Sequence, residues 1–230
     1  MQKLYARWFG VVFILSFISY ALGMGLMDVL QDSKMHPQEL LNQEWKLKWG
    51  FILCAVVHTG CNLGLLSIMV TLLRGNYAVL ASFYGSCGLV STVLLALGAA
   101  VLVLPFEIVR EAQEVVEGNA NQGVLLWTGL AVKMNFYLYQ TGMTIWGIGG
   151  LSLAYGFWQY RLVPRVFPLW AVVGYLAFLI GTLLEFFNYP VGVWLSIPGG
   201  LFELALSVWV IFKGFNTTMN PPDGLAGIKI

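Results

Sequence analysis

The side chains best suited to chemistry in this chain are a few ionisable and amide groups that interrupt long apolar runs. His58 and Asn62 stand four residues apart in the run that follows Trp49, so on a helix they share one face. Glu203 stands in the run that follows Pro198. These groups can bind the polar part of a ligand or hold a proton. Because burying a polar group in apolar surroundings costs free energy, they are candidates for function.

Three further polar residues extend this set. Lys133 opens the fourth apolar run, Glu185 closes the fifth, and Ser207 follows Glu203 by one helical turn. We expect Glu203 to point into the helix bundle, with Lys133 or His58 as its nearest polar partner. The alternative is that these groups only lock helices together or, for Lys133, reach the membrane surface. The candidate polar pocket or network comprises Glu203, Lys133, His58, Asn62, Glu185 and Ser207.

The motifs of familiar enzymes and metal sites are missing from the sequence. The patterns HExxH, CxxC and GxSxG do not occur, and Cys54, Cys61 and Cys87 lack the spacing of a metal site. The two histidines are His36 and His58, and His36 stands in a polar loop, which argues against a haem held by histidines from two spans. We therefore predict no catalytic residue and no metal site, and the sequence indicates no particular cofactor.

The composition places these groups in a membrane protein. Charged residues make up 10% of the chain and hydrophobic residues 59%, against about 25% and about 45–50% in ordinary globular proteins. The predicted fold class is therefore all-α, a polytopic bundle of transmembrane helices that forms a single domain over 1–230. A net charge of +1 argues against nucleic acid as a partner.

Six apolar runs define the predicted spans. Prolines fall between these runs or within their first three residues, so each run is predicted to be one continuous helix. Pro198 would then begin the sixth helix, with Glu203 near its N-terminal turn. The approximate bounds are 8–27, 49–73, 77–104, 134–160, 166–184 and 198–212.

Basic residues favour one side of this arrangement. The two short connections, 74–76 and 161–165, contain arginines and no acidic residue. The two longer connections on the opposite side hold most of the acidic residues. The positive-inside rule therefore places both termini in the cytoplasm.

The connection that follows Pro105 has a helical pattern of its own. Ile108, Val109 and Ala112 recur at helical spacing, with Glu107 and other charged residues on the remaining faces. We predict an amphipathic helix at 106–117 outside the membrane. It would rest on the bilayer or on the protein's own loops; the alternative is a docking surface for another membrane protein.

Three stretches of the sequence resemble a known family. They are ARWFGVVFIL at 6–15, LVPR at 162–165, and PGGLFE at 198–203 followed by LSVWVIFKG at 206–214. The chain is similar there to the bacterial six-span membrane proteins catalogued as domain of unknown function 4386. The resemblance implies a multi-pass protein of the bacterial inner membrane and implies no activity. The motif positions are Arg7, Pro164, Arg165, Pro198, Glu203, Trp209, Lys213 and Gly214.

Three functions are compatible with these observations. The first is non-enzymatic binding of a hydrophobic or lipid-like ligand, or of a partner membrane subunit. The second is a small transporter or channel that uses the polar cluster in the outer half, which would need a polar path inward past Asn62. The third is an intramembrane enzyme with Glu203 or His58 as general base. We favour them in that order, and the sequence does not indicate an oligomeric state.

Overall fold

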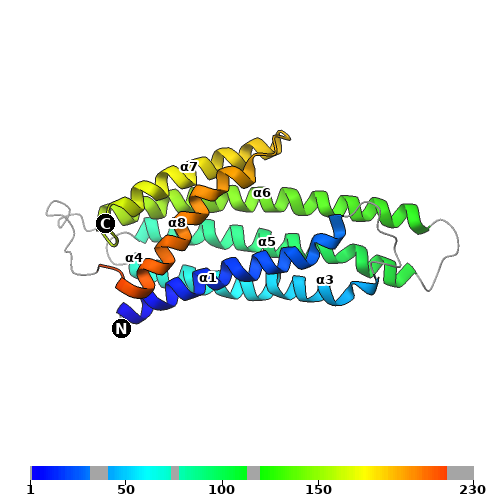
Figure 1. Cartoon of the computed structure of the whole chain (residues 1–230), viewed down its shortest axis with the longest axis horizontal. Helices are drawn as coiled ribbons and strands as arrows, with labels where there is room; N and C mark the ends of the chain where they lie inside the picture. Colours follow the sequence, from blue (N-terminus) through cyan, green and yellow to red (C-terminus); the bar gives the residue numbers. More distant parts are fainter. Residues whose placement is uncertain (1, 32–40, 74–77, 113–119, 217–230) are drawn as a thin grey trace.

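The computed structural model describes residues 2–31, 41–73, 78–112 and 120–216, and this part of the chain is entirely helical apart from its connections. Figure 1 shows the long helices lying side by side, with the N-terminus at one end of the bundle. The elements are α1 (Gln2–Met27), η1 (Asp28–Gln31), α3 (Glu44–Phe51), η2 (Ile52–Val57), α4 (His58–Leu73), α5 (Ala78–Ala112), α6 (Ala120–Tyr160), α7 (Val166–Phe186) and α8 (Gly192–Lys213).

The elements α3, η2 and α4 form one uninterrupted helical segment. Its middle part, η2, is π-helical, and the backbone N–H of His58 donates to the carbonyl of Leu53, five residues earlier. A π-helical turn rotates the residues that follow it relative to a regular helix. It therefore sets the face on which His58 and Asn62 project.

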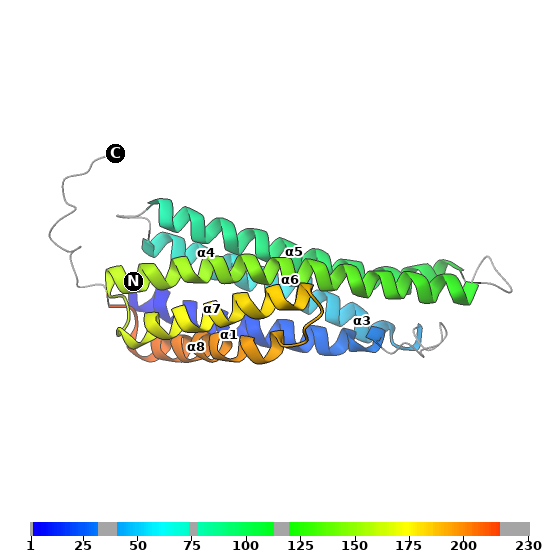
Figure 2. The ribbon, with the colours of Figure 1, turned by 90° about the horizontal axis from the view of Figure 1, so that it is seen from above.

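The helices are arranged in a ring. Each long helix packs against the next along the chain, and α8 returns to pack against α1. Figure 2 shows that α5 and α6 extend beyond the connection between α7 and α8, so the bundle is longest along these two helices. The ring brings α1, α4, α6 and α8 around one interior, which is where the candidate site lies.

Five helical segments of the described chain are long and apolar enough to cross a membrane. The helix α6 is not among them, because its stretch from Met134 to Tyr160 is rich in tyrosine, tryptophan, glycine and polar residues. A sixth crossing therefore stays a prediction. The outward-facing side chains, such as Leu22, Val79 and Val173, are exposed and apolar, which implies contact with the bilayer. The five candidate spans are Leu4–Met27, Glu44–Leu73, Ala78–Glu111, Val166–Phe186 and Gly192–Lys213.

The interior is apolar at both ends of the bundle. The larger cluster includes Phe9, Phe157 and Phe202 and fills the half near the N-terminus. A smaller one, with Met27 and Phe106, joins α1, α3 and α5 at the opposite end. Polar side chains are buried between these two clusters.

The prediction that prolines mark the ends of helices was wrong at two places. Pro105 lies inside α5 and Pro198 inside α8. A membrane helix tolerates proline because neighbouring groups satisfy the freed carbonyls. As a result, residues 106–112 form the end of α5 rather than the start of a separate helix, and the rest of the predicted outer helix, 113–117, lies outside the described residues.

Candidate ligand cavity and buried polar network

A hydrogen-bonded network joins α1, α4 and α5 in the interior. Ser16 Oγ donates to Asn62 Oδ1 at 2.7 Å, and Asn62 Nδ2 lies 3.0 Å from His58 Nε2 and 3.2 Å from Thr92 Oγ1. His58 Nδ1 lies 3.1 Å from the Ser16 carbonyl oxygen and 3.0 Å from Ser16 Oγ. Thr92 in turn donates to the Gly88 carbonyl at 2.7 Å. The predicted shared face of His58 and Asn62 thus points inward and is filled by partners from two other helices.

The network fixes one arrangement of hydrogens. The amide nitrogen of Asn62 can only donate, so His58 Nε2 accepts from it. His58 Nδ1 therefore carries the ring proton and donates toward Ser16. In this form the imidazole is neutral and both of its nitrogens have a partner, which is the low-cost state for a buried histidine.

The close approach of α1 to the α3–α4 segment holds this network in place. Gly23 and Gly50 face each other, and a Cβ on Gly23 would stand 2.9 Å from the Gly50 carbonyl oxygen. Beside them, Cys54 Sγ donates to the Tyr20 carbonyl at 3.7 Å. Small residues at this crossing let the two backbones meet, so Ser16 reaches the side chains of α4.

Glu203 projects into the bundle, as predicted, and is 6% exposed. Its Oε1 accepts hydrogen bonds from Tyr175 Oη at 2.7 Å and from Trp146 Nε1 at 2.9 Å. Both bonds that the described residues make to this carboxylate end on Oε1. The described residues make no hydrogen bond to its second oxygen, Oε2, and Glu203 lines the cavity described next.

The prediction of the partners of Glu203 was wrong. Lys133 is exposed, and His58 makes its bonds with Ser16 and Asn62. The position predicted for Glu203 was also wrong, because α8 begins at Gly192 and places Glu203 about three turns into the helix. Pro198 does not begin the helix, so the partial positive charge of a helix N-terminus is remote from this carboxylate.

A cavity of about 200 Å³ lies between the histidine network and Glu203. His58 and Asn62 line it from α4, Glu203 lines it from α8, and aromatic side chains make up much of the wall between them. The arrangement offers polar contacts at two separated points with an apolar surface in between. The lining residues are Phe13, Ser16, Phe17, Tyr20, Ala21, His58, Asn62, Ser91, Leu95, Tyr139, Met143, Trp146 and Glu203.

A second cavity, of about 460 Å³, adjoins the first toward the α7–α8 connection. Tyr20 and Tyr139 line both cavities, and their rings stack with centroids 6.1 Å apart. Tyr20 also contacts the His58 ring, at a centroid distance of 4.8 Å. The stacked tyrosines therefore separate the two cavities. Below, the cavity of about 200 Å³ is called the inner cavity and that of about 460 Å³ the outer cavity.

The remaining predicted site residues lie apart from the inner cavity. Glu185 lines the outer cavity, where its Oε1 accepts from the backbone N–H of Gly192 at 2.8 Å and so caps the start of α8. Ser207 donates to the carbonyl of Glu203 at 2.7 Å within α8 and does not line either cavity. The structure thus brings His58, Asn62 and Glu203 around one space and leaves Lys133, Glu185 and Ser207 outside it.

Several residues of the site were not predicted from the sequence. Ser16, Thr92, Trp146 and Tyr175 supply most of the hydrogen bonds to the predicted polar groups. Serine, threonine and aromatic residues are common in membrane helices, so their types alone give no signal. In the described part of the chain, no group of His, Cys, Asp and Glu side chains is arranged to hold a metal ion.

Comparison with known proteins identifies the family of this chain but no individual relative. No curated protein and no solved structure matches the chain. A family model does match, over residues 8–214, which covers almost all of the described helices and every residue of the inner cavity. This match confirms the resemblance noted in the sequence, and the chain belongs to the family described as "Domain of unknown function (DUF4386)".

Proposed function

We propose that this protein binds a small amphipathic ligand in the inner cavity and does not transform it. The observation that carries the proposal is the cavity itself, with apolar walls between the polar groups of α4 and the carboxylate of Glu203. Binding sites for small molecules are commonly apolar cavities with a few polar groups that fix orientation. The outer cavity, which shares Tyr20 and Tyr139 with the inner one, is the route of entry.

The volume limits the size of the ligand. A dry apolar cavity of about 150 Å³ holds a benzene molecule. The inner cavity, at about 200 Å³, therefore suits a substituted ring or a short chain with a polar group. A donor on the ligand would meet the free Oε2 of Glu203, while its apolar body would contact Phe13, Phe17 and Trp146.

The surroundings of the cavity favour binding over conduction. Beyond Asn62, α4 continues toward the N-terminal end of the bundle with Leu65, Leu66 and Met69, all buried in the larger apolar cluster. A transporter or channel would need polar or hydrated surface along that path. An intramembrane enzyme would need a nucleophile or an activated water beside His58 or Glu203.

The arrangement that we propose is a bacterial inner-membrane protein with six crossings, of which α6 is the fourth. Both termini then lie on the cytoplasmic side. Its support is the distribution of charge among the described residues. The end of the bundle that holds the N-terminus carries the basic residues Arg7, Arg161, Arg165 and Lys213, and the described residues there include no carboxylate. The acidic residues Asp28, Glu44, Glu107 and Glu185 lie toward the opposite end. The position of α6 between α5 and α7 in the ring also supports a crossing.

A cavity-filling substitution tests the proposed ligand. Ala21 lines the inner cavity, so Ala21→Phe should occupy it and abolish binding. The protein would be purified in a mild detergent, its small molecules extracted and identified by mass spectrometry. We expect a compound that co-purifies with the natural protein and is depleted at least about tenfold in Ala21→Phe, equivalent to about 1.4 kcal/mol of binding free energy.

The matched control is Ala78→Phe, which adds the same ring at an exposed position on α5 remote from the cavity. The control should retain the compound at the natural level. Equal retention by both variants, or no co-purifying compound in the natural protein, would contradict the proposal.

A further inference from the structure

The polar groups at the two sides of the inner cavity differ in how far the protein itself satisfies them. Both ring nitrogens of His58 have protein partners in the network of α1 and α4. Glu203 accepts two hydrogen bonds, one from Tyr175 and one from Trp146, and both end on Oε1. The described residues make no hydrogen bond to Oε2, so this carboxylate can still accept one from a ligand.

The charge of Glu203 is also left without a cationic partner in the described part of the chain. The ion pairs found there lie on α3 and α5 and do not include it. The residues that line the inner cavity, all of them described, contain no lysine or arginine. Because the His58 ring is neutral, an ionised Glu203 gives this cavity an unbalanced negative charge.

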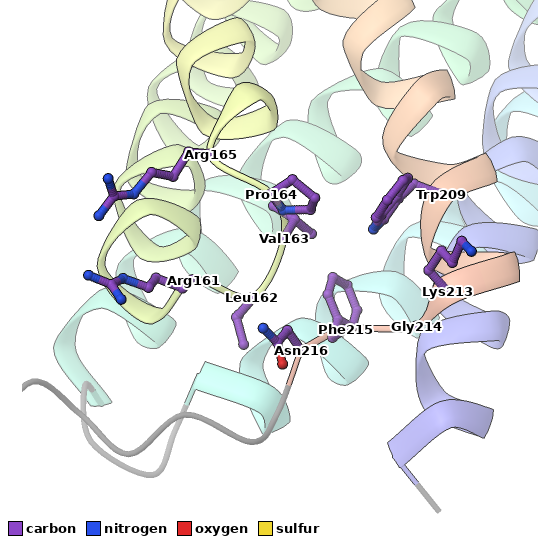
Figure 3. A pocket seen from close by; sticks show the side chains of 10 residues that line it. All are labelled: Arg161, Leu162, Val163, Pro164, Arg165, Trp209, Lys213, Gly214, Phe215 and Asn216. Carbon is purple, nitrogen blue, oxygen red and sulfur yellow. The ribbon is translucent and has the colours of Figure 1, made fainter.

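The basic residues of the described chain lie elsewhere. Figure 3 shows three of them, Arg161, Arg165 and Lys213, around a separate pocket of about 450 Å³ at the connection between α6 and α7 and the end of α8. Their charged ends are directed away from that pocket, and all three residues are exposed. None of them lines the inner cavity, so they do not supply the charge that Glu203 lacks.

Aromatic rings form much of the wall that leads to the carboxylate. Phe13 and Phe17 line the inner cavity from α1, and Trp146 lines it from α6. The Phe13 ring centroid lies 5.7 Å from that of Phe17 and 6.4 Å from that of Trp146, and Trp146 is bonded to Glu203. Aromatic rings attract a cation within about 6 Å of their centroids. Aromatic rings beside one carboxylate therefore suit an organic cation.

We infer that the ligand of the inner cavity is a small organic cation, a protonated amine attached to an apolar body. This inference rests on the proposed function and names the class of its ligand. The ammonium group donates a hydrogen bond to Glu203 Oε2 and supplies the missing positive charge, while the apolar body contacts the aromatic wall. An anionic ligand would add a second negative charge beside the carboxylate, and a neutral one would leave the buried charge unbalanced.

Three probes of similar size and different charge test this inference. At neutral pH benzylamine is a cation, benzyl alcohol is neutral and benzoate is an anion. Equilibrium dialysis against the purified protein in a neutral detergent measures their binding. The amount bound to Ala21→Phe, whose inner cavity is filled, is subtracted as the background of the micelle. We expect benzylamine to bind at least about tenfold more tightly than benzyl alcohol, and benzoate to bind more weakly than either.

The outcomes separate this inference from the proposed function. Equal affinity for benzylamine and benzyl alcohol would overturn the inference and leave a cavity that binds small molecules of either kind. If no probe binds to the natural protein in excess of Ala21→Phe, the inner cavity does not bind small molecules of this kind and the proposed function fails as well.

A substitution at the carboxylate tests the same point without changing the probe. Glu203→Gln keeps a carbonyl oxygen as acceptor and removes the charge, so it should weaken benzylamine binding at least about tenfold and change benzyl alcohol binding less than about twofold. The matched control is Glu111→Gln, which removes an exposed carboxylate from α5, remote from the inner cavity. The control should bind benzylamine as the natural protein does. Unchanged benzylamine binding by Glu203→Gln, or an equal loss in the control, would show that the charge of Glu203 does not hold the ligand.

Discussion

Glu203 shows how a carboxylate is accommodated in the interior of a membrane bundle. An isolated charge at that depth costs several kcal/mol, and hydrogen bonds from fixed donors offset part of that cost. Tyr175 from α7 and Trp146 from α6 supply two such donors to the same oxygen. The carboxylate is therefore the point at which three helices meet through side-chain hydrogen bonds.

Substitutions at Glu203 should separate its role as an acceptor from its charge. Glu203→Gln keeps a carbonyl oxygen for Tyr175 and Trp146, so the free energy of unfolding should change by less than about 1 kcal/mol. Glu203→Leu leaves both donors buried without a partner and should cost about 1–3 kcal/mol for each. Denaturant unfolding in detergent measures both, and an equal loss in the two variants would show that the charge, rather than the acceptor, matters.

At this scale the sequence predicts which residues face inward better than it predicts their partners. The four-residue spacing of His58 and Asn62 defines a shared helix face whatever the fold, and both are buried. The choice between Lys133 and the actual partners of Glu203 depends on how α6, α7 and α8 pack. A lysine also reaches water easily at the end of a span, which removes any need to pair inside.

The elements around the cavity are positioned by close contacts at small residues. Gly150 on α6 lies directly against the ring of Tyr175, and Gly174 on α7 faces Gly199 on α8. These contacts bring α6, α7 and α8 near enough for Tyr175 to reach Glu203. The glycines of the fourth apolar run are thus packing residues, and their abundance lowers the hydropathy of α6 without removing it from the ring.

A single added methyl group at Gly150 should disturb this packing. A Cβ at that position would overlap the Tyr175 ring, so Gly150→Ala should displace the ring, weaken its bond to Glu203 and cost about 1–3 kcal/mol. The control is Gly60→Ala on α4, where nothing stands within 4 Å of the added Cβ and alanine should be neutral or stabilising. The midpoint of thermal unfolding in detergent reports both, and similar midpoints would refute the packing role.

Helix positions follow from the sequence more closely than helix ends do. Each predicted span overlaps a helix, because long apolar runs have few other ways to satisfy their backbones in a membrane. The ends were misplaced where proline was taken as a boundary, at Pro105 and Pro198. The π-helical turn before His58, where η2 packs against α1, has no counterpart in the apolar pattern of the sequence.

The charged residues are distributed unevenly between the two ends of the molecule. The described end near the N-terminus is basic, and the opposite end mixes cations with carboxylates, including the ion pair between Lys48 and Glu44 and that between Arg110 and Glu107. In a membrane this asymmetry favours one orientation.

Cysteine labelling tests the proposed orientation and the crossing by α6. The native cysteines Cys54, Cys61 and Cys87 would be replaced by alanine, and Tyr5→Cys, Leu126→Cys and Arg165→Cys introduced one at a time. All three positions are exposed. A maleimide that does not cross membranes should label only Leu126→Cys in intact cells, and the other two only after lysis.

The result for Arg165→Cys decides whether α6 crosses. If Leu126→Cys and Arg165→Cys are labelled from the same side, α6 does not span the bilayer and the six-span arrangement is wrong. If Tyr5→Cys and Arg165→Cys are labelled from outside and Leu126→Cys is not, the orientation is inverted. Labelling after solubilisation is the control that each introduced thiol is reactive.

The closure of the ring by α1 and α8 has a consequence for how the protein is made. Gly10 on α1 packs against the backbone of Ser207 on α8, nearly two hundred residues later in the chain. While the ribosome is still translating, the inserted helices form only an open arc, and the α8-facing side of the first helix is covered by lipid. The inner cavity acquires its carboxylate and its last wall only when α8 inserts. A product truncated before α8 would therefore lack Glu203 and would leave the Gly10 face of α1 in contact with lipid.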